Sequence, residues 1–400
     1  MNNLLVWDNE IIAGGVETIQ LNLIPALAKK FKQVIWVLPD HKLQYFKGKI
    51  KPLDNNNLTI VALGYHKTIA GSLLRNLDQI FKKIPLWERL CSGFQRKIIN
   101  RILSGLIEHF QADILFTTCI FSQPFPSVRI PVTGVLHDFN YDHDDKPEVL
   151  ENMRNWVSQS SVIFTISEYS ERQIREYCPK VGGELKVVSW AVDADLDKIE
   201  TPTGINPFRF IFPASAIATK GHKVLFEAFK SLLEEGVDAE LVLTGGGTQE
   251  LLSTEPIENK DLEKARLFYH DNRHLFQNNL QAKGYLEEKK FRQLVESCSV
   301  FVLPSLKEGF GLPLLEAVCC GRSVLCSQIE PFQEQVSRFS LESIVSFFKP
   351  GDSRDLARIM HNQVGLLPDQ IRLQKAKSRV LNWTWSDIAQ AYFDEMQKVT

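Results

Sequence analysis

Short apolar segments rich in β-branched residues alternate with amphipathic segments along the first half of the chain. The apolar runs are at 3–7, 33–38, 58–63, 112–118, 132–137, 161–167 and 185–192. A helical pattern over 14–30 follows the first of these runs. Strands that alternate with helices form a parallel sheet covered by helices on both faces. The first half is therefore predicted to be a doubly wound α/β domain.

The same alternation restarts near residue 208. Strands are predicted at 208–215, 239–247, 278–286, 299–305 and 323–328. Helical patterns cover 220–236, 287–298 and, at the end of the chain, 383–399. A second doubly wound domain is therefore expected, with ligands binding where the carboxyl ends of the strands meet a cleft.

A polar, proline-containing segment at 193–208 separates the two series and is interpreted as a linker. The chain of 400 residues is also too long for one ordinary core. We expect an N-terminal domain over 1–195, a C-terminal domain over 196–380, and a closing helix within 381–400 that packs on the N-terminal domain.

Composition excludes several classes of protein. Hydrophobic residues make up 44% and charged residues 24%, which is ordinary for a globular protein, and the net charge of -2 gives no reason to expect nucleic acid as a partner. The seven cysteines show no C-x-x-C spacing and suit buried, reduced thiols. No signal-peptide pattern or membrane-length apolar run is found, so a cytoplasmic location is expected.

Two glutamates stand in EGFGLPLLEAVCCG, which covers 308–321 and follows the predicted strand at 299–305. Loops at the carboxyl ends of parallel strands bind ligands in open α/β sheets. Gly309 and Gly311 lack side chains, so backbone N–H groups can approach a ligand closely. A helix that begins near Pro313 adds the positive end of its dipole, and the loop is therefore predicted to bind an anion such as phosphate.

Glu308 and Glu316 bracket this loop, and Glu316 is surrounded by apolar residues. A carboxylate accepts two O–H hydrogen bonds from a vicinal diol, so each glutamate suits sugar or ribose hydroxyls. The segment would then bind a sugar, a phosphate and a ribose in order, as in a nucleotide-sugar. The alternative is a solvated Glu308 and a Glu316 paired with a lysine or arginine. The Glu-x7-Glu spacing around GFGLP favours the first interpretation.

The stretch EGFGLPLLEA closely resembles the Glu-x7-Glu signature of glycosyltransferase family 4, the group 1 glycosyltransferases. AGGVE at 13–17, the stretch at 133–179 and KGH at 220–222 resemble other segments of that family. The resemblance covers most of the chain and implies the GT-B fold: two Rossmann-like domains facing a cleft, with a C-terminal helix that crosses back to the first domain. It also implies retention of anomeric configuration and no required metal or other cofactor.

The resemblance implies catalytic roles for Glu308, His137 and Lys220. Glu308 would position the donor sugar, His137 would reach that sugar, and Lys220 would stabilise the diphosphate leaving group. A lysine at a helix N-terminus is poorly placed for the helix dipole, which favours a ligand as the reason for Lys220.

One position departs from the family pattern. Members often carry an arginine five residues before the lysine, where this chain has Ser215. The second phosphate cation is then missing or comes from elsewhere, and Arg209 and Lys223 are the candidates.

Donor-binding roles are implied for Gly14, Gly15, Gly245, Tyr285, Gly309, Phe310, Gly311, Leu312 and Glu316. Glu316 would bind the ribose. The alternative for the glycine pair at 14 and 15 is a tight strand-to-helix turn, and for Tyr285 it is a core position.

Two charged segments remain. DHDD at 142–145 suits a solvated loop better than a metal site. The segment 67–110 carries a net charge of +5, with apolar residues at helical spacing. It is either an ordinary solvated helical face or a patch that contacts the membrane surface or an anionic acceptor.

We therefore expect a retaining, metal-independent hexosyltransferase. It would move a hexose, with mannose as the candidate, from a nucleoside-diphosphate sugar to a hydroxyl of a glycan or lipid-linked acceptor, in the cytoplasm or at the inner face of the membrane. The alternatives are another GT-B enzyme, such as a nucleotide-sugar epimerase or a phosphorylase, and a non-catalytic sugar-binding protein. A dinucleotide-dependent oxidoreductase is disfavoured because neither GGVETI nor GGGTQE supplies G-x-G-x-x-G.

Overall fold

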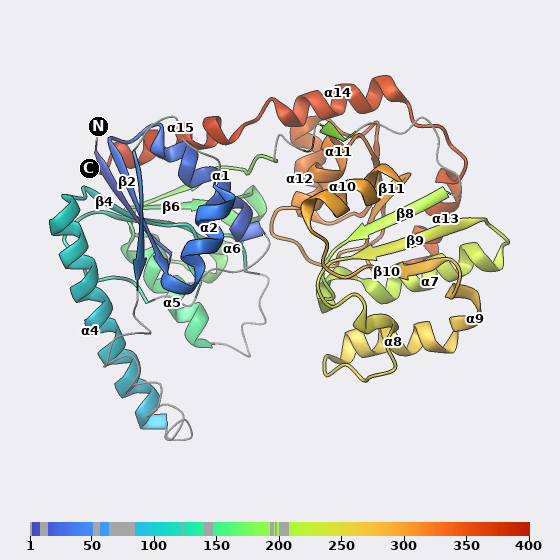
Figure 1. The fold of residues 1–400 in the computed structure, drawn as a ribbon, viewed down its shortest axis with the longest axis horizontal. Coiled ribbons are helices and arrows are strands. Elements are labelled where there is room, and N and C mark those ends of the chain that lie inside the picture. Colours follow the sequence, from blue (N-terminus) through green and yellow to red (C-terminus); the bar gives the residue numbers. More distant parts are fainter. Residues whose placement is uncertain are drawn as a thin grey trace. The chain divides into compact units, whose positions relative to one another are not determined.

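The structure is a computed structural model that describes most of the chain (Figure 1). The described residues are 2–8, 15–50, 57–63, 85–121, 124–139, 147–192, 196, 198–199 and 208–400. The chain forms two compact units: residues 1–190 with 385–400, and residues 191–384. These boundaries lie a few residues from the predicted ones, and most of the predicted linker at 193–208 is outside the described residues.

The first unit contains a parallel sheet in the order β3-β2-β1-β4-β5-β6-β7. Its strands are β1 (Asn3–Trp7), β2 (Gln33–Pro39), β3 (Leu58–Leu63), β4 (Ile114–Thr117), β5 (Val132–Val135), β6 (Val162–Thr165) and β7 (Glu184–Val187). The chain reverses direction across the sheet between β1 and β4, so a ligand site is expected at the carboxyl ends of these two strands.

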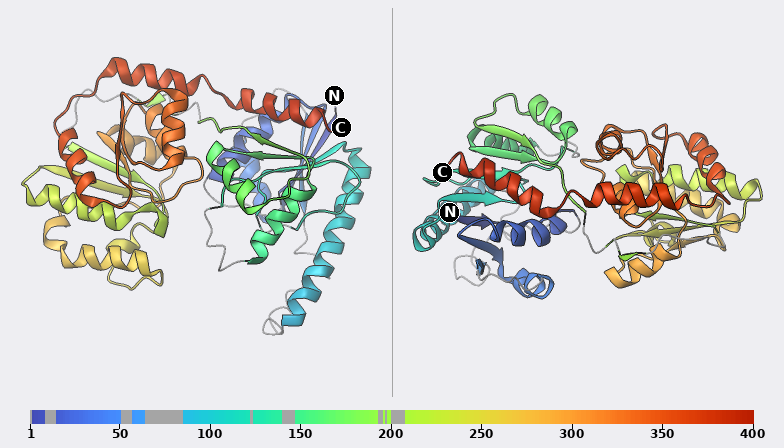
Figure 2. Two further views of the ribbon diagram at one scale, coloured as in Figure 1. Left: turned by 180° about the vertical axis from the view of Figure 1, so that it is seen from behind. Right: turned by 90° about the horizontal axis from the view of Figure 1, so that it is seen from above.

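Helices cover both faces of this sheet. They are α1 (Gly15–Ala28), α2 (Leu43–Lys49) after the short turn η1 (Asp40–Lys42), α4 (Pro85–Phe110), α5 (Pro147–Gln159), α6 (Glu168–Tyr177) and α15 (Trp385–Gln397). The C-terminal α15 belongs to the first unit and packs beside α1, as both views in Figure 2 show. The expectation that the C-terminal helix returns to the first domain is therefore confirmed.

Alternate residues of the central strands fill two separate cores. Leu115 and Ile163 belong to the cluster that packs under α4, α5 and α6. Phe116 and Phe164 point to the opposite face, where both rings contact Tyr392 of α15. Side chains of a strand alternate between faces, and burial on both faces explains why these runs are continuously apolar.

The second unit repeats the architecture with a parallel sheet in the order β10-β9-β8-β11-β12-β13. Its strands are β8 (Phe208–Pro213), β9 (Ala239–Thr244), β10 (Leu280–Ala282), β11 (Val300–Leu303), β12 (Ser323–Ser327) and β13 (Val345–Phe348). Five of these strands fall within the predicted segments, whereas β13 was not predicted. The reversal of strand order here lies between β8 and β11.

Two groups of helices flank the second sheet. The elements are η4 (Ala218–Lys220), α7 (His222–Glu234), η5 (Glu250–Leu252), α8 (Lys260–Asp271), α9 (Arg273–Phe276), α10 (Glu288–Glu296), α11 (Leu312–Cys319), α12 (Glu330–Phe339), α13 (Ser353–Gln363) and α14 (Gln370–Leu381). Helix α7 packs with α8 and α13, and α11 packs with α14 (Figure 1). None of the helices in the described ranges is both long and apolar enough to cross a membrane.

Candidate functional site

The loops after β8 and β11 meet at the carboxyl edge of the second sheet, where the strand order reverses. The N–H of Leu306, in the loop after β11, donates to the carbonyl oxygen of Thr219, in η4, over 2.7 Å. The strands themselves are neighbours, with Val300 opposite Phe210 and Phe301 opposite Ile211. The two loops therefore form one surface at the position where open α/β sheets bind ligands.

Lys220 and Glu308 meet on this surface. Lys220 Nζ lies 2.6 Å from Glu308 Oε1, and the Ser305 hydroxyl donates to the same oxygen over 2.7 Å. The side chains of Lys220 and Glu308 are 20% and 11% exposed. Glu308 is therefore not a solvated loop residue, and the Lys220 side chain is mostly buried beside it.

Gly221 makes this pairing possible. It has a φ of 73° and caps the start of α7. A Cβ at this position would lie 2.0 Å from the carbonyl oxygen of Pro304. Only glycine fits both the left-handed backbone and the close approach, which holds the Lys220 loop against the loop that carries Glu308.

The start of α11 has the geometry expected for an anion site. Gly311 caps the helix with a φ of 91°, and Pro313 lies in the first turn. Gly309 and Phe310 are buried, while Leu312 is half-buried. Such a helix start presents the positive end of the helix dipole, which favours a bound anion.

Glu316 lies on α11, between the buried residues Leu315 and Ala317. Its own side chain is half-buried, so part of it reaches the surface. A carboxylate in this position can accept hydrogen bonds from a ligand without being fully desolvated.

The loops after β9 and β10 border the same edge. Gly245 follows β9 with a φ of 129°, and a Cβ there would lie 2.5 Å from the carbonyl carbon of Ala214. Its N–H donates over 2.8 Å to the carbonyl oxygen of Gly284, which follows β10. The next residue, Tyr285, is 76% exposed. Tyr285 is therefore not a core aromatic, and its ring is available for a ligand.

The two candidates for a second phosphate cation, Arg209 and Lys223, lie at opposite edges of the second sheet. Ser215 is exposed in the loop between β8 and η4. Arg209 lies at the amino end of β8 and pairs with Glu240 at 2.7 Å, so it is at the wrong edge of the sheet. Lys223 lies in the first turn of α7 and pairs with Glu227 at 3.0 Å. Only Lys223 remains near the correct edge.

His222 follows the glycine cap and is 2% exposed. Neither ring nitrogen has a hydrogen-bond partner among the described residues. Burial, with a smaller contribution from the charge of Lys220, lowers the pKa of His222 to about 4. The side chain is therefore neutral at physiological pH.

In the first unit, His137 follows β5 at the carboxyl edge of the sheet. Its Nε2 lies 2.8 Å from the carbonyl oxygen of Thr118, and its ring packs edge-on against Trp190. Because a carbonyl oxygen only accepts, Nε2 carries the proton. Burial lowers the pKa of His137 to about 4, against the opposing hydrogen bond to Thr118. The neutral ring leaves Nδ1 as an acceptor without a partner among the described residues.

Sequence reasoning missed Asp8, which follows β1 and is 1% exposed. The carboxylate accepts from Trp36 Nε1 at 2.8 Å, from the Thr118 N–H at 2.9 Å and from the Thr118 hydroxyl at 2.8 Å. Burial raises the pKa of Asp8, and these hydrogen bonds oppose the rise. The signal in the sequence was an acidic residue directly after an apolar strand.

Several expectations fall wholly or partly outside the described residues. Gly14 and the DHDD segment at 142–145 are not described, and Gly15 is the first residue of α1. Of the basic segment 67–110, side chains are described only from 96 on. There Ile99, Leu103 and neighbouring apolar residues pack on the core, so this part is an ordinary amphipathic helix with a solvated basic face.

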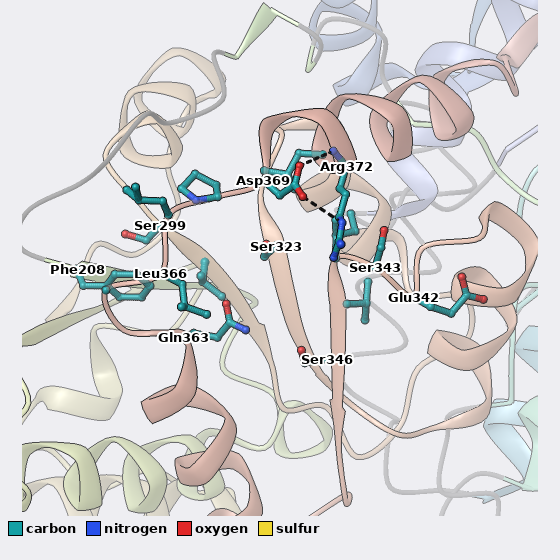
Figure 3. Close-up of a pocket in the computed structure, with 17 residues that line it drawn as sticks. Phe208, Ser299, Ser323, Glu342, Ser343, Ser346, Gln363, Leu366, Asp369 and Arg372 are labelled. Carbon is teal, nitrogen blue, oxygen red and sulfur yellow. Dashed lines mark hydrogen bonds and ion pairs between the residues drawn. The ribbon is translucent and has the colours of Figure 1, made fainter.

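The described residues contain no group of three or more histidine, cysteine, aspartate or glutamate side chains arranged to bind a metal ion. A cavity of about 470 Å³ lies at the amino edge of the second sheet, beside the link between α13 and α14 (Figure 3). Phe208 and Ser323 line it, and Arg372 pairs there with Asp369 at 3.0 Å. This cavity is at the opposite strand ends from Lys220 and Glu308.

Most of the second unit matches a family model. The model described as glycosyl transferases group 1 matches residues 195–363. The matched range includes the Lys220–Glu308 pair, the start of α11 and Glu316.

Curated relatives add two enzymes. The serotype-specific mannosyltransferase WbdA of Escherichia coli is 32% identical over 124 residues, which are 30% of this chain and 14% of WbdA. The chain therefore spans only about a seventh of that relative's length. The N,N'-diacetylbacillosaminyl-diphospho-undecaprenol alpha-1,3-N-acetylgalactosaminyltransferase of Campylobacter jejuni is 31% identical over 363 residues, covering 89% of this chain and 81% of that enzyme.

Solved structures share the fold of the whole chain. HepE from Anabaena, in complex with UDP and glucose, has a TM-score of 0.66 with 14% identity, and the match covers 100% of both chains. Together with the other structural neighbours, this likeness confirms the predicted GT-B fold of two Rossmann-like domains with a C-terminal helix.

Proposed function

Because this chain belongs to the group 1 glycosyl transferases, we propose that it is a retaining hexosyltransferase. It transfers a hexose from a nucleoside-diphosphate sugar to a hydroxyl of a glycan or a lipid-linked acceptor. The single observation that carries the proposal is the Lys220–Glu308 pair at the point of strand-order reversal in the second unit.

The pair is suited to exchange partners when a donor binds. Lys220 leaves Glu308 and neutralises the diphosphate, next to the start of α11. Glu308 is then released to accept hydrogen bonds from the sugar hydroxyls, with the Ser305 hydroxyl still holding Oε1. Glu316 accepts from the ribose hydroxyls, and the ring of Tyr285 lies against the base. Each group then contacts the part of the donor that its chemistry suits.

The reaction we propose proceeds on one face of the sugar. The acceptor oxygen forms a bond to the anomeric carbon while the bond from that carbon to the diphosphate oxygen breaks. The acceptor proton passes to an oxygen of the departing diphosphate, and Lys220 stabilises the negative charge that develops there. His137 supplies a neutral acceptor nitrogen, Nδ1, for a sugar hydroxyl. The proposal requires no metal ion.

The donor is the open part of the proposal. WbdA transfers mannose according to its name, and the Campylobacter enzyme transfers N-acetylgalactosamine. The WbdA likeness is confined to 30% of the chain, whereas the Campylobacter likeness extends over 89%. Mannose from GDP-mannose therefore remains one candidate, and a UDP-linked N-acetylhexosamine is the other.

The acceptor and location follow from the same relatives. The Campylobacter enzyme's name describes a diphospho-undecaprenol acceptor, and WbdA is named for a serotype. We propose that this chain contributes to a bacterial surface polysaccharide from the cytoplasm, at the inner face of the membrane. Contact with lipid through 67–110 is part of this proposal.

Donor binding with EDTA present tests the proposal. UDP-, GDP-, ADP- and dTDP-sugars are titrated against the wild type, Lys220→Met and Lys230→Met, and nucleoside diphosphate release is followed. Lys230 is the matched control because it lies further along α7 and pairs there with Glu234 at 3.2 Å, away from the proposed donor site. We expect one donor to bind and hydrolyse slowly, with affinity lost at least about tenfold in Lys220→Met only.

Two outcomes would count against this function. If no donor binds, the chain acts on something other than a nucleotide-sugar, and Ser215 at the usual arginine position becomes the leading reason. If a donor binds but neither hydrolysis nor transfer is found with any hydroxyl acceptor, a non-catalytic nucleotide-sugar-binding protein replaces the enzyme. An isomerised hexose released from the donor would instead indicate an epimerase.

A further inference from the structure

Asp8 occupies the carboxyl end of β1 in the first unit, at the point where the strand order reverses. Four hydrogen bonds converge on its two carboxylate oxygens. Oδ2 accepts from Trp36 Nε1 at 2.8 Å, and Oδ1 accepts from the Thr118 N–H and the Thr118 and Thr117 hydroxyls, at 2.9, 2.8 and 3.4 Å. A group so buried and so fully paired is held rigidly, and it holds its donors rigidly in turn.

Thr118 connects Asp8 to His137 through hydrogen bonds. The Thr118 hydroxyl also accepts from Gln20 Nε2 at 3.0 Å, so the residue is held by β1 on one side and by α1 on the other. Its carbonyl oxygen receives the Nε2–H of His137 over 2.8 Å. That hydrogen bond decides which ring nitrogen carries the proton and where Nδ1 points.

We propose that Asp8 is a positioning residue for His137. Asp8 fixes Thr118, the Thr118 carbonyl oxygen fixes the tautomer of His137, and Nδ1 is thereby kept as an acceptor for a substrate hydroxyl. The inference rests on the proposed function for its effect on the reaction, but its effect on the histidine does not depend on any substrate.

Asparagine at position 8 keeps the shape of aspartate but not its chemistry. The four groups that hydrogen-bond to the Asp8 carboxylate are all donors, whereas an amide offers one oxygen and one NH₂ group. In either orientation the NH₂ group would face a donor, either Trp36 Nε1 or the Thr118 N–H. The hydrogen bond from Trp36 Nε1 or the one from the Thr118 N–H is therefore lost in Asp8→Asn. We expect the Thr118 carbonyl to shift relative to His137 as a result.

A matched control is available on the same pair of strands. Asp113 precedes β4 at the amino edge and accepts from the Asn3 N–H over 2.8 Å. Its side chain is exposed, and it lies at the other end of the sheet from His137. Asp113→Asn therefore repeats the same chemical change on the same strand pair without touching the network.

The first measurement needs no substrate. Nitrogen-15 NMR of histidine-labelled protein distinguishes protonated from unprotonated ring nitrogens, and the His137→Ala variant assigns the signals. We expect the wild type and Asp113→Asn to show His137 with Nε2 protonated only. Asp8→Asn should show a mixture of tautomers in a folded chain. A single Nε2 tautomer in folded Asp8→Asn would overturn the proposal.

The second measurement is kinetic. With the donor that the binding panel identifies, Asp8→Asn should lower kcat by about ten- to a hundredfold with the donor KM nearly unchanged, because misplacement of a reacting group costs rate. The double variant Asp8→Asn/His137→Ala should be no slower than His137→Ala alone. A further loss in the double variant would show that Asp8 acts by another route. If the tautomers shift as expected but no donor is turned over, the proposed function fails while the positioning stands.

Discussion

His222 shows how one buried side chain can make the second unit sensitive to pH. Its ring lies 4.9 Å from that of Phe212, and neither nitrogen has a partner among the described residues. Burial lowers the pKa of His222 because the protonated ring would lose its hydration, and the nearby charge of Lys220 lowers this pKa further.

Replacing His222 with phenylalanine is expected to flatten the pH dependence of stability. The folded pKa of about 4 lies below the ordinary value of 6.5, so between these pH values only the unfolded chain binds the proton. The wild type therefore gains free energy of unfolding as the pH rises from 4 to 6.5, by up to about 3 kcal/mol. Urea unfolding of the second unit across this range measures the slope, and equal slopes in the two proteins would contradict this reading.

At the scale of elements, the two ends of α7 offer a controlled comparison. Gly221 and Gly236 have nearly the same backbone conformation, with φ of 73° and 79°. Alanine at either position adds the strain of a left-handed residue, roughly 1–2 kcal/mol. A Cβ at Gly221 would also lie 2.0 Å from Pro304 O, whereas at Gly236 no atom lies within 4 Å.

We therefore expect Gly221→Ala to destabilise the second unit more than Gly236→Ala. It should also weaken donor binding, because the loop that carries Lys220 must move away from the loop that carries Glu308. Thermal unfolding and donor titration of the two variants measure the two effects. Similar losses in both would mean that the contact with Pro304 is easily relieved.

The alternation of strands and helices was enough to predict the architecture, because strands buried on both faces give continuous apolar runs. It did not reveal β13, whose four residues have the partly exposed burial of an edge strand. Nor could it give the order of strands in either sheet. Neighbours such as β8 and β11 are separated by about 90 residues, and no local pattern records their pairing.

The candidate site was predicted where a local motif carried it. Glu308, Glu316 and the glycines between them lie within one segment, so spacing alone identified them. Ser305 and Asp8 were missed for different reasons. Serine is common in loops, so nothing in the sequence distinguished Ser305, whose hydroxyl donates to Glu308. Asp8 was missed because its hydrogen-bond partner Thr118 lies 110 residues away in the sequence.

At the scale of the whole molecule, α15 completes the first unit from the far end of the chain. Tyr392 is fully buried, and its ring stacks on Phe164 with centroids 3.9 Å apart. Phe393 packs edge-on against Phe31 at 5.0 Å, and Glu395 pairs with Lys186 at 3.7 Å. Helix α15 covers this apolar face together with α1, against which it packs.

Deletion of residues 385–400 should therefore destabilise the first unit selectively. Hydrogen exchange is expected to accelerate in β1, β4 and β6, while amides of β8 to β13 keep their protection, because the two units have separate cores. Tyr392→Ala should give a smaller loss in the same strands, about 3–5 kcal/mol as for other large buried aromatics. Equal acceleration in both units would show that they unfold as one.

Because α15 belongs to the first unit, that unit cannot complete its fold until the end of the chain has been synthesised. About 220 residues separate the end of β6 from the start of α15, and a ribosome adding roughly 5–20 residues per second needs on the order of ten to forty seconds to cover them. Throughout that interval Phe116 and Phe164 face water or a chaperone. The second unit, whose residues are contiguous, can fold as soon as it emerges. The part of the protein that is made first is therefore the last to be finished.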